Sequence, residues 1–351
     1  ATINFAESID TVQTDLAEIQ PTIFPAVPRI LEKMHTSALV RMRDASFVKK
    51  ILFKFSMYLG DIAVERKLNK NFDDLLAKIL LSIGYVLSFR TLRKKLGLQR
   101  AEFAASGAAP IAPEVLKFFM SIGVPLFEAY GMTENCAYAT SNSPENIKIG
   151  TVGIPAHGVE LKLADDGEIL IRSGGVFKGY FKDEQATNET IDKDGWLYTG
   201  DVGIYEGDFV KIVDRKRDII ITSGGKNVSP SEIENKIKVS PFVKEAIVIG
   251  DRRKFLSVLI GIEFDTVSNW ALRKNIPHTT YRDLSEKQEV KDLIWREISK
   301  ANEKTSSLEV REFRMIPKEL DHEEGELTAT QKVKRNVLVE QFNDLIEEMY
   351  S

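Results

Sequence analysis

The stretch from Gly195 to Pro230 holds the polar side chains whose spacing suggests chemistry most directly. Asp201 follows a Thr-Gly pair, so its carboxylate is expected to stand beyond a tight turn with two free acceptor oxygens. Residues 214–218 are five consecutive charged residues, Asp-Arg-Lys-Arg-Asp, between two apolar stretches. Such a run cannot lie inside one core without many partners, and it suits an exposed connection between two folded bodies. We therefore predict a hinge here, with polar ligand contacts at the seam of two domains.

Three further motifs stand in order along the chain. They are Ser106-Gly107-Ala108-Ala109-Pro110, Tyr130-Gly131-Met132-Thr133-Glu134 and Leu327-Thr328-Ala329-Thr330-Gln331-Lys332. Together with residues 195–230 they resemble the motifs of the adenylate-forming enzymes, the superfamily of acyl-CoA synthetases, luciferases and peptide-synthetase adenylation domains. Within that superfamily the sequence is most similar to the long-chain fatty-acid–CoA ligases, and the resemblance covers nearly the whole chain. One such motif would be weak evidence, but four in the family's order are specific.

This resemblance implies the ATP-dependent activation of a long-chain fatty acid to acyl-AMP, followed by transfer of the acyl group to CoA. A carboxylate is a poor electrophile, and adenylation converts it into a mixed anhydride with pyrophosphate as leaving group. The enzyme must therefore hold ATP, Mg²⁺ and CoA, and must stabilise developing charge. Two alternatives stay open: a fatty-acyl-AMP ligase that delivers to a carrier protein, and a non-catalytic module that retains the fold.

The resemblance also assigns nucleotide contacts. Tyr130 supplies a flat ring that stacks on adenine, Thr133 a hydroxyl for the α-phosphate, and Glu134 a hard oxygen ligand for Mg²⁺. The alternative for this motif is a strand-to-helix turn with Glu134 solvated. Small residues let the backbone approach the purine closely. The remaining members of the cofactor-binding set are Gly107, Ala108, Ala109, Pro110 and Gly131.

Asp201 and Arg215 are the expected ribose contacts. The resemblance implies that the Asp201 carboxylate accepts both ribose hydroxyls and that Arg215 donates to the same sugar across the domain seam. The alternative is a surface Asp-Arg pair, worth about 0–1 kcal/mol.

Lys332 matches the family's catalytic lysine, which reaches the reacting carboxylate and the α-phosphate. Its point charge suits a transition state in which negative charge spreads over oxygens. The sequence around Lys332 departs from the Ser-Gly-Lys motif common elsewhere in the superfamily, so Lys334 is the alternative candidate for this role. A solvated lysine in a basic run is the other alternative.

Arg217 occupies the family's hinge position, about which the smaller domain swings between the two half-reactions. One pose brings in the lysine for adenylation. The other brings in the turn Gly224-Gly225-Lys226, which is the expected CoA contact because glycines let the thiol pass close to the backbone.

Composition narrows the class of protein. At 351 residues, two or three folded bodies are expected. The apolar share of 43% and the charged share of 28% are those of an ordinary globular protein, and a net charge of −4 gives no bulk attraction to nucleic acid. The single cysteine fits a reducing compartment, and the four scattered histidines lack metal-ligand spacing. We expect a cytoplasmic protein, with a peripheral position at the inner membrane face as the alternative.

The pattern predicts an α/β fold in several parts. Residues 1–149 are expected to be the carboxyl-terminal part of a large AMP-binding domain, with a βαβ unit near residues 102–129 and a helical insert at residues 37–100. Residues 150–213 have short strands and dense turns, which indicate a small antiparallel barrel or sandwich. Residues 214–217 form the hinge, and residues 218–351 a mobile α+β domain.

The helical insert combines apolar residues with many lysines and arginines. It could rest on an anionic membrane surface. The alternative is a helical hairpin packed on the main domain with its basic side chains solvated. Its longest uncharged run, residues 79–89, is shorter than the roughly 20 residues that a membrane span needs.

The family's phosphate-binding loop, a Ser/Thr/Gly-rich word ending in Pro-Lys-Gly, is absent from the sequence, as are the Walker A and G-x-G-x-x-G motifs. That loop lies upstream of all the motifs found here. The chain is therefore expected to be a carboxyl-terminal portion that adenylates weakly or not at all alone. Acyl chain length and oligomeric state cannot be derived from these residues.

Overall fold

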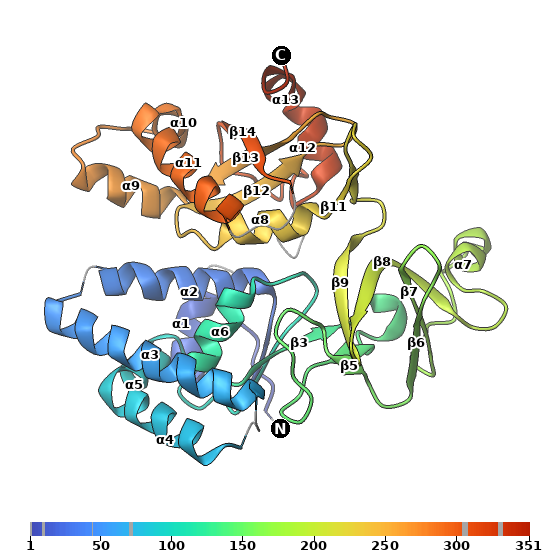
Figure 1. The fold of residues 1–351 in the computed structure, drawn as a ribbon, viewed down its shortest axis with the longest axis horizontal. Helices are drawn as coiled ribbons and strands as arrows, with labels where there is room; N and C mark the ends of the chain where they lie inside the picture. The colour runs from blue at the N-terminus through green and yellow to red at the C-terminus, as the bar shows by residue number, and fades with distance from the viewer. Residues whose placement is uncertain (1, 9–10, 44, 70–72, 304–307, 329–332) are drawn as a thin grey trace. The chain divides into compact units, whose positions relative to one another are not determined.

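The computed structural model describes residues 2–8, 11–43, 45–69, 73–303, 308–328 and 333–351 (Figure 1). The chain divides into two compact units, residues 1–213 and residues 214–351. The division falls at the first residue of the predicted hinge. Lys332, with residues 329–331, lies outside the described residues.

The first unit contains a five-stranded sheet in the order β1-β2-β3-β4-β5. Its first three strands are parallel and the last two antiparallel. Helix α6 connects β2 to β3, so the predicted βαβ unit is confirmed. The carboxyl ends of β2 and β3 share one edge of the sheet, and the 106–110 and 130–134 motifs follow those ends. The bounds are β1 Ile23–Ala26, β2 Phe103–Ser106, α6 Pro113–Ser121, β3 Leu126–Tyr130, β4 Thr140–Ser141 and β5 Ile154–Pro155.

Helices occupy most of residues 12–95. The described ones are α1 Val12–Ile19, α2 Pro28–Arg43, α3 Phe47–Asn69, α4 Leu75–Gly84, the π-helical turn Tyr85–Phe89 and α5 Arg90–Lys95. Helix α4 begins where the Asp74 carboxylate accepts from the Ala77 N–H, an ordinary N-cap. Helices α2 and α3 pack against α6, and the Ser121 hydroxyl donates to Asp61 at 2.7 Å. One face of the insert therefore packs on the α/β part of the first unit.

The antiparallel strands predicted for residues 150–213 are present, but they form a four-stranded sheet in the order β6-β7-β8-β9 rather than a closed barrel. A short helix, α7, is inserted between β7 and β8. The bounds are β6 Val159–Leu163, β7 Glu168–Ser173, α7 Glu184–Thr190, β8 Leu197–Glu206 and β9 Phe209–Arg215.

The second unit is built on a three-stranded sheet, β12-β13-β14, with an antiparallel first pair and a parallel second pair. Side chains alternate between two cores: Val258 and Ile260 pack into one, and Leu259 into the other with the last two helices. Every residue of β13 is buried, because the sheet is covered on both faces. The bounds are β10 Ile220–Ile221, β11 Asn227–Val228, α8 Pro230–Lys238, β12 Val243–Ile249, β13 Leu256–Ile262, α9 Phe264–Arg273, α10 Tyr281–Glu286, α11 Gln288–Glu303, β14 Val310–Met315, α12 Arg335–Gln341 and α13 Asn343–Glu348.

Candidate nucleotide site

Tyr130 and Asp201 meet directly although 71 residues separate them. The Tyr130 hydroxyl donates to Asp201 Oδ2 at 2.6 Å, and both residues are buried. Tyr130 ends strand β3 and Asp201 lies within β8. The sequence assigned these two residues to one nucleotide, the ring to adenine and the carboxylate to ribose. Their contact satisfies the distance that this assignment requires.

Asp201 was predicted to follow a tight Thr-Gly turn, but residues 199–201 form a bulge within strand β8. Leu170 of β7 pairs with Tyr198 of β8, and Glu168 pairs with Val202. One residue on β7 therefore faces three on β8, Thr199 to Asp201. Gly200, at the centre, has φ +69°, a left-handed conformation that other residues adopt at a cost. Bulges of this kind re-aim side chains and are frequent beside functional sites.

Side chains complete the hydrogen bonds that the bulge removes from the strand ladder. The Gly200 N–H donates to Glu168 Oε1 at 2.9 Å. The Thr199 hydroxyl donates to the Ile169 carbonyl at 2.7 Å and accepts from the Asp201 N–H at 3.2 Å. The bulge is thus held by defined bonds on both sides of Gly200.

The 106–110 motif leaves the end of β2 as an irregular turn. Ala108 has φ +70°, and a Cβ added to Gly107 would come within 3.1 Å of the Ala129 carbonyl oxygen. The backbone of this turn therefore lies against β3 near Tyr130. Ala109 is half-buried and Pro110 is exposed. This close approach agrees with the small residues predicted here.

Thr133 and Glu134 lie on a single 3₁₀ turn, Thr133–Asn135, just past β3. Thr133 is exposed, and Glu134 Oε1 accepts from the Tyr180 hydroxyl at 2.9 Å. Burial of the Tyr180 ring, together with this bond, raises the pKa of Tyr180 above its ordinary value. Glu134 thus combines an oriented carboxylate with access to solvent.

Glu134 fits Mg²⁺ as one carboxylate ligand among others. Among the described residues, no group of three or more His, Cys, Asp or Glu side chains could hold a metal ion. Mg²⁺ keeps waters and commonly binds through one or two carboxylates plus substrate phosphates. One hard oxygen beside a nucleotide matches that donor set.

Three polar groups to which the sequence analysis gave no role accompany the motifs. Glu128 lies two residues before Tyr130, and its Oε2 accepts from the Gly150 N–H at 3.1 Å. Burial raises the pKa of Glu128 to about 8, and the bond from Gly150 opposes that rise in part. Ser106 Oγ and Asn135 Nδ2 are buried without a hydrogen-bond partner in the described part of the chain. Their positions beside the motifs are the only sequence signal that could have identified them.

The remaining candidates belong to the second unit. Arg215 ends β9, and Arg217 is exposed in the turn that follows. The turn Gly224-Gly225-Lys226 joins β10 to β11, is exposed, and contains Gly225 at φ +76°. Lys334 is exposed at the start of α12, and Lys332 lies outside the described residues, so the choice between these lysines stays open.

Asp214 corrects one expectation. The run 214–218 was predicted to be an exposed connection, but Asp214 is buried. Its carboxylate accepts from the hydroxyls of Ser229 and Ser231 at 2.8 and 2.9 Å, and from the Ser231 N–H at 3.0 Å. These donors satisfy the buried charge at the start of helix α8. The exposed residues of the run are Lys216 and Arg217.

Comparisons with known proteins agree with this architecture. Residues 1–181 match the family model described as AMP-binding enzyme, and residues 217–351 match the AMP-binding enzyme C-terminal domain. The chain is 34% identical, over its full length and 58% of the relative's, to the long-chain-fatty-acid–CoA ligase FadD15 of Mycobacterium bovis. The chain thus spans less than two thirds of this relative.

Solved structures share the fold. The adenylation domain of a carboxylate reductase from Mycobacterium chelonae superposes with a TM-score of 0.71 at 22% identity, covering 98% of this chain and 49% of that one. The adenylation domain of a carboxylic acid reductase from Segniliparus rugosus, in complex with AMP and a co-purified carboxylic acid, gives 0.66 at 21% identity, with 99% and 50% coverage. The motifs, the fold and the two family models lead to one assignment: the chain belongs to the AMP-binding enzyme family.

Proposed function

We propose that this chain carries the adenylate site and the C-terminal domain of a long-chain fatty-acid–CoA ligase. The reaction activates a long-chain fatty acid with ATP and Mg²⁺ to acyl-AMP, and then transfers the acyl group to CoA. The identification of the 34% identical relative as a long-chain-fatty-acid–CoA ligase supports the fatty acid and CoA, and the AMP bound by the Segniliparus rugosus domain supports the adenylate. The roles of the site residues are part of this proposal.

The hydrogen bond between Tyr130 and Asp201 carries the proposal. It brings an aromatic ring and a buried carboxylate to one place at the end of β3. A carboxylate has two acceptor oxygens with several lone pairs, so acceptance from Tyr130 is compatible with acceptance from ribose hydroxyls. An aromatic ring offers an apolar surface for a base, and such stacking contributes about 1–3 kcal/mol per base.

Binding of AMP to the 351-residue chain is the direct test. We expect saturable binding by calorimetry, with at least a tenfold loss in Asp201→Asn, because a buried charged acceptor would become a neutral amide with only one acceptor oxygen. Asp208→Asn is the matched control, since Asp208 is an exposed carboxylate in the loop after β8. Equal affinities in both variants would contradict the ribose role of Asp201.

The acyl acceptor needs a separate experiment on the natural gene product that contains these residues. Release of AMP from ATP and a long-chain fatty acid should depend on CoA. Release that depends instead on a phosphopantetheinylated carrier protein would favour the fatty-acyl-AMP ligase. AMP binding without either reaction would favour a non-catalytic module. The 351-residue chain should show weak or no fatty-acid-dependent exchange between ATP and pyrophosphate, because it lacks the phosphate-binding loop. Clear exchange would contradict that expectation.

Arg217 is proposed as the pivot between the two half-reactions. Its side chain is 77% exposed, with Asp218 at 3.9 Å. Proline at this position would fix φ, whereas alanine would remove the side chain and leave the backbone free. We expect Arg217→Pro to slow one half-reaction far more than the other, and Arg217→Ala to slow neither selectively. Equal losses in both half-reactions for the proline variant would count against the pivot.

We also propose that residues 37–100 contact an anionic membrane surface. Helix α4, the π-helical turn and α5 run together from Leu75 to Lys95, and only 17% of the most apolar 18-residue stretch of this helix is buried. By length and composition this helix could also cross a membrane. The expectation that residues 79–89, the longest uncharged run, are too short for a membrane span is corrected in this respect. One side is nevertheless packed inward, because Ala77, Gly84 and Phe89 are buried. A helix with one packed and one apolar exposed face suits a position on the membrane surface.

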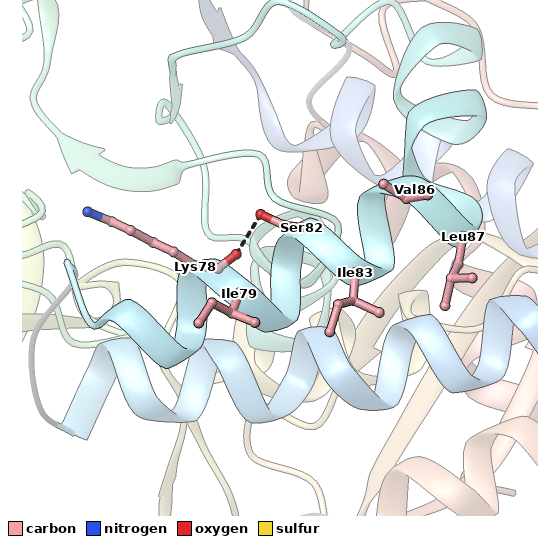
Figure 2. A pocket seen from close by; sticks show the side chains of 6 residues that line it. All are labelled: Lys78, Ile79, Ser82, Ile83, Val86 and Leu87. Atoms are coloured by element: carbon pink, nitrogen blue, oxygen red, sulfur yellow. Dashed lines mark hydrogen bonds between the residues drawn. The ribbon is translucent and has the colours of Figure 1, made fainter.

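The exposed face of this helix is apolar over three turns and basic at its end. Ile79, Ile83 and Leu87 line one pocket of about 490 Å³. Figure 2 shows these three side chains projecting from the same side of the helix. Val86 is 80% exposed. Exposed basic side chains follow at the end of this helix and on α3: Arg90, Lys94, Lys95, Lys49 and Lys54. Apolar side chains beside lysines and arginines are complementary to anionic lipid.

Co-sedimentation with vesicles tests this contact. The chain should bind vesicles that contain phosphatidylglycerol and bind pure phosphatidylcholine much less. Ile83→Asp should abolish binding, whereas Ile204→Asp, at similar exposure on β8, should not. The lipid proposal would be overturned if the chain does not bind vesicles and light scattering instead shows a dimer that Ile83→Asp dissociates. That result would mean that a second copy of the chain covers the exposed apolar face. The cytoplasmic location expected from composition stays a prediction.

A further inference from the structure

We propose that Glu168 is a positioning residue for the nucleotide site, because its carboxylate fixes the bulge that presents Asp201. This inference rests on the proposed ribose contact of Asp201. Glu168 lies outside every motif that the sequence singled out, 33 residues before Asp201. Its effect on the nucleotide is exerted through the backbone.

The geometry at Gly200 is the first step. Gly200 lies in the bulge, between the paired residues of the β7–β8 register. Glu168 Oε1 accepts this N–H at 2.9 Å. Gly200 has φ +69° and a Cβ built on it would meet nothing within 4 Å, so packing against Gly200 does not hold this conformation. The bond from Glu168 therefore restrains the residue that directly precedes Asp201.

Burial of Glu168 is the second step. The residue is 7% exposed at the first position of β7. A buried carboxylate needs hydrogen-bond donors to compensate for lost hydration. A carboxylate on an exposed helix or loop would not lose that hydration. A hydrogen bond that a backbone N–H donates to a charged acceptor is stronger than one between neutral groups. Glu168 thus gives the bulge a rigid support.

The path from Glu168 to the ligand is short. Glu168 holds Gly200, Asp201 follows in the chain, and Asp201 Oδ2 accepts from Tyr130 at 2.6 Å. Thr199 holds the other side of Gly200 through Ile169. A shift of the bulge would move the carboxylate away from the ring without removing either group. The expected consequence is a loss of ribose recognition rather than of adenine stacking.

The test compares AMP with 2′,3′-dideoxy-AMP, whose sugar lacks both hydroxyls. The wild-type chain should prefer AMP. The dissociation constant of dideoxy-AMP divided by that of AMP measures ribose recognition. Glu168→Ala should lower this ratio by about tenfold, since it removes a bond to a charged acceptor. Glu168→Gln should keep the ratio within about threefold, because its amide oxygen can still accept from Gly200. Affinity for dideoxy-AMP should change little in either variant.

A control and a second measurement make the outcomes distinct. Glu160→Ala removes an exposed carboxylate from the neighbouring strand β6, where it pairs with Arg172, and should leave the ratio unchanged. Amide hydrogen exchange at residues 197–203 should speed up in Glu168→Ala and not in Glu168→Gln. No preference for AMP in wild type would overturn the proposed ribose site itself. A preserved ratio in a folded Glu168→Ala, with or without faster exchange, would overturn only the role of Glu168.

Discussion

The hydroxyl of Tyr130 lies 2.6 Å from Oδ2 of Asp201, so the two residues that we propose for adenine and ribose are joined by a hydrogen bond. In the free chain this bond satisfies a carboxylate that is only 6% exposed. The ring edge, rather than the ring face, is engaged by the bond. The proposed stacking of the ring on adenine leaves this bond in place.

Tyr130→Phe isolates this bond. The ring remains, but Asp201 loses a donor at a buried site, which should lower the free energy of unfolding by about 1–3 kcal/mol. AMP affinity should fall less than in Asp201→Asn, because ribose hydroxyls can supply donors when the nucleotide binds. Chemical denaturation with and without AMP measures both effects. Tyr138→Phe is the control, since that exposed hydroxyl makes only a 3.5 Å contact with a carbonyl. Equal stabilities of the two variants would contradict the importance of the Tyr130 bond.

Gly131 permits the close turn after β3. A Cβ added there would come within 2.2 Å of the Ala137 carbonyl carbon, a backbone atom that cannot move aside alone. Gly131→Ala should therefore destabilise the chain by roughly 2–4 kcal/mol and weaken AMP binding. Gly174→Ala, where nothing lies within 4 Å, should be neutral or slightly stabilising. Thermal unfolding of the pair provides the comparison, and similar midpoints would show that the turn tolerates a side chain.

Glu128 should make stability fall as pH rises. Burial raises its folded pKa to about 8 from an ordinary 4.5, so between these values the folded chain binds more protons than the unfolded chain. Its unfavourable contribution therefore grows from about pH 5 and levels off above pH 8, reaching roughly 3–5 kcal/mol. Glu128→Gln stays neutral and keeps an acceptor for the Gly150 N–H.

The measurement is the difference in free energy of unfolding between wild type and Glu128→Gln from pH 5 to pH 9. This difference should favour the variant increasingly as pH rises and then become constant. Glu145→Gln, at an exposed carboxylate, should show no such trend. A flat difference for Glu128→Gln would mean that the carboxyl group ionises at its ordinary pKa.

The sequence located the two strand ends because motif residues and the βαβ pattern coincide there. The apolar segments before residues 106–110 and 130–134 predicted where strands β2 and β3 end. Because these strands are parallel, their carboxyl ends lie at one edge of the sheet. The contact between Tyr130 and Asp201 follows from the resemblance, which assigned both to a single nucleotide. No local pattern could show it, since the two residues lie on different sheets.

Glu168 and the bulge were beyond sequence reasoning for a physical reason. Thr199 and Gly200 suggest a turn by their residue types, but the strand continues past them. The Gly200 N–H donates to Glu168, and the Thr199 hydroxyl donates to the Ile169 carbonyl. That compensation depends on a partner strand whose register is not encoded locally. A small antiparallel barrel or sandwich was expected for residues 150–213, and the strands form one four-stranded sheet, because turn spacing predicts antiparallel strands but not how they close or stack.

Asp214 shows how a charged run can divide between burial and exposure. Its carboxylate accepts three hydrogen bonds from Ser229 and Ser231 at the first turn of α8, where the helix dipole also favours negative charge. Asp214→Ala should therefore destabilise the second unit by about 2–4 kcal/mol, because the donors that it satisfies lose their shared acceptor. Asp208→Ala, at an exposed aspartate in the loop after β8, should cost less than about 0.5 kcal/mol.

Hydrogen exchange resolved by segment provides the measurement: protection of residues 230–238 should fall in Asp214→Ala and stay unchanged in Asp208→Ala. Unchanged protection in both variants would mean that Asp214 does not anchor α8. With the anchor present, any pivot has to begin after Asp214, at the exposed Lys216 and Arg217 rather than at the start of the charged run.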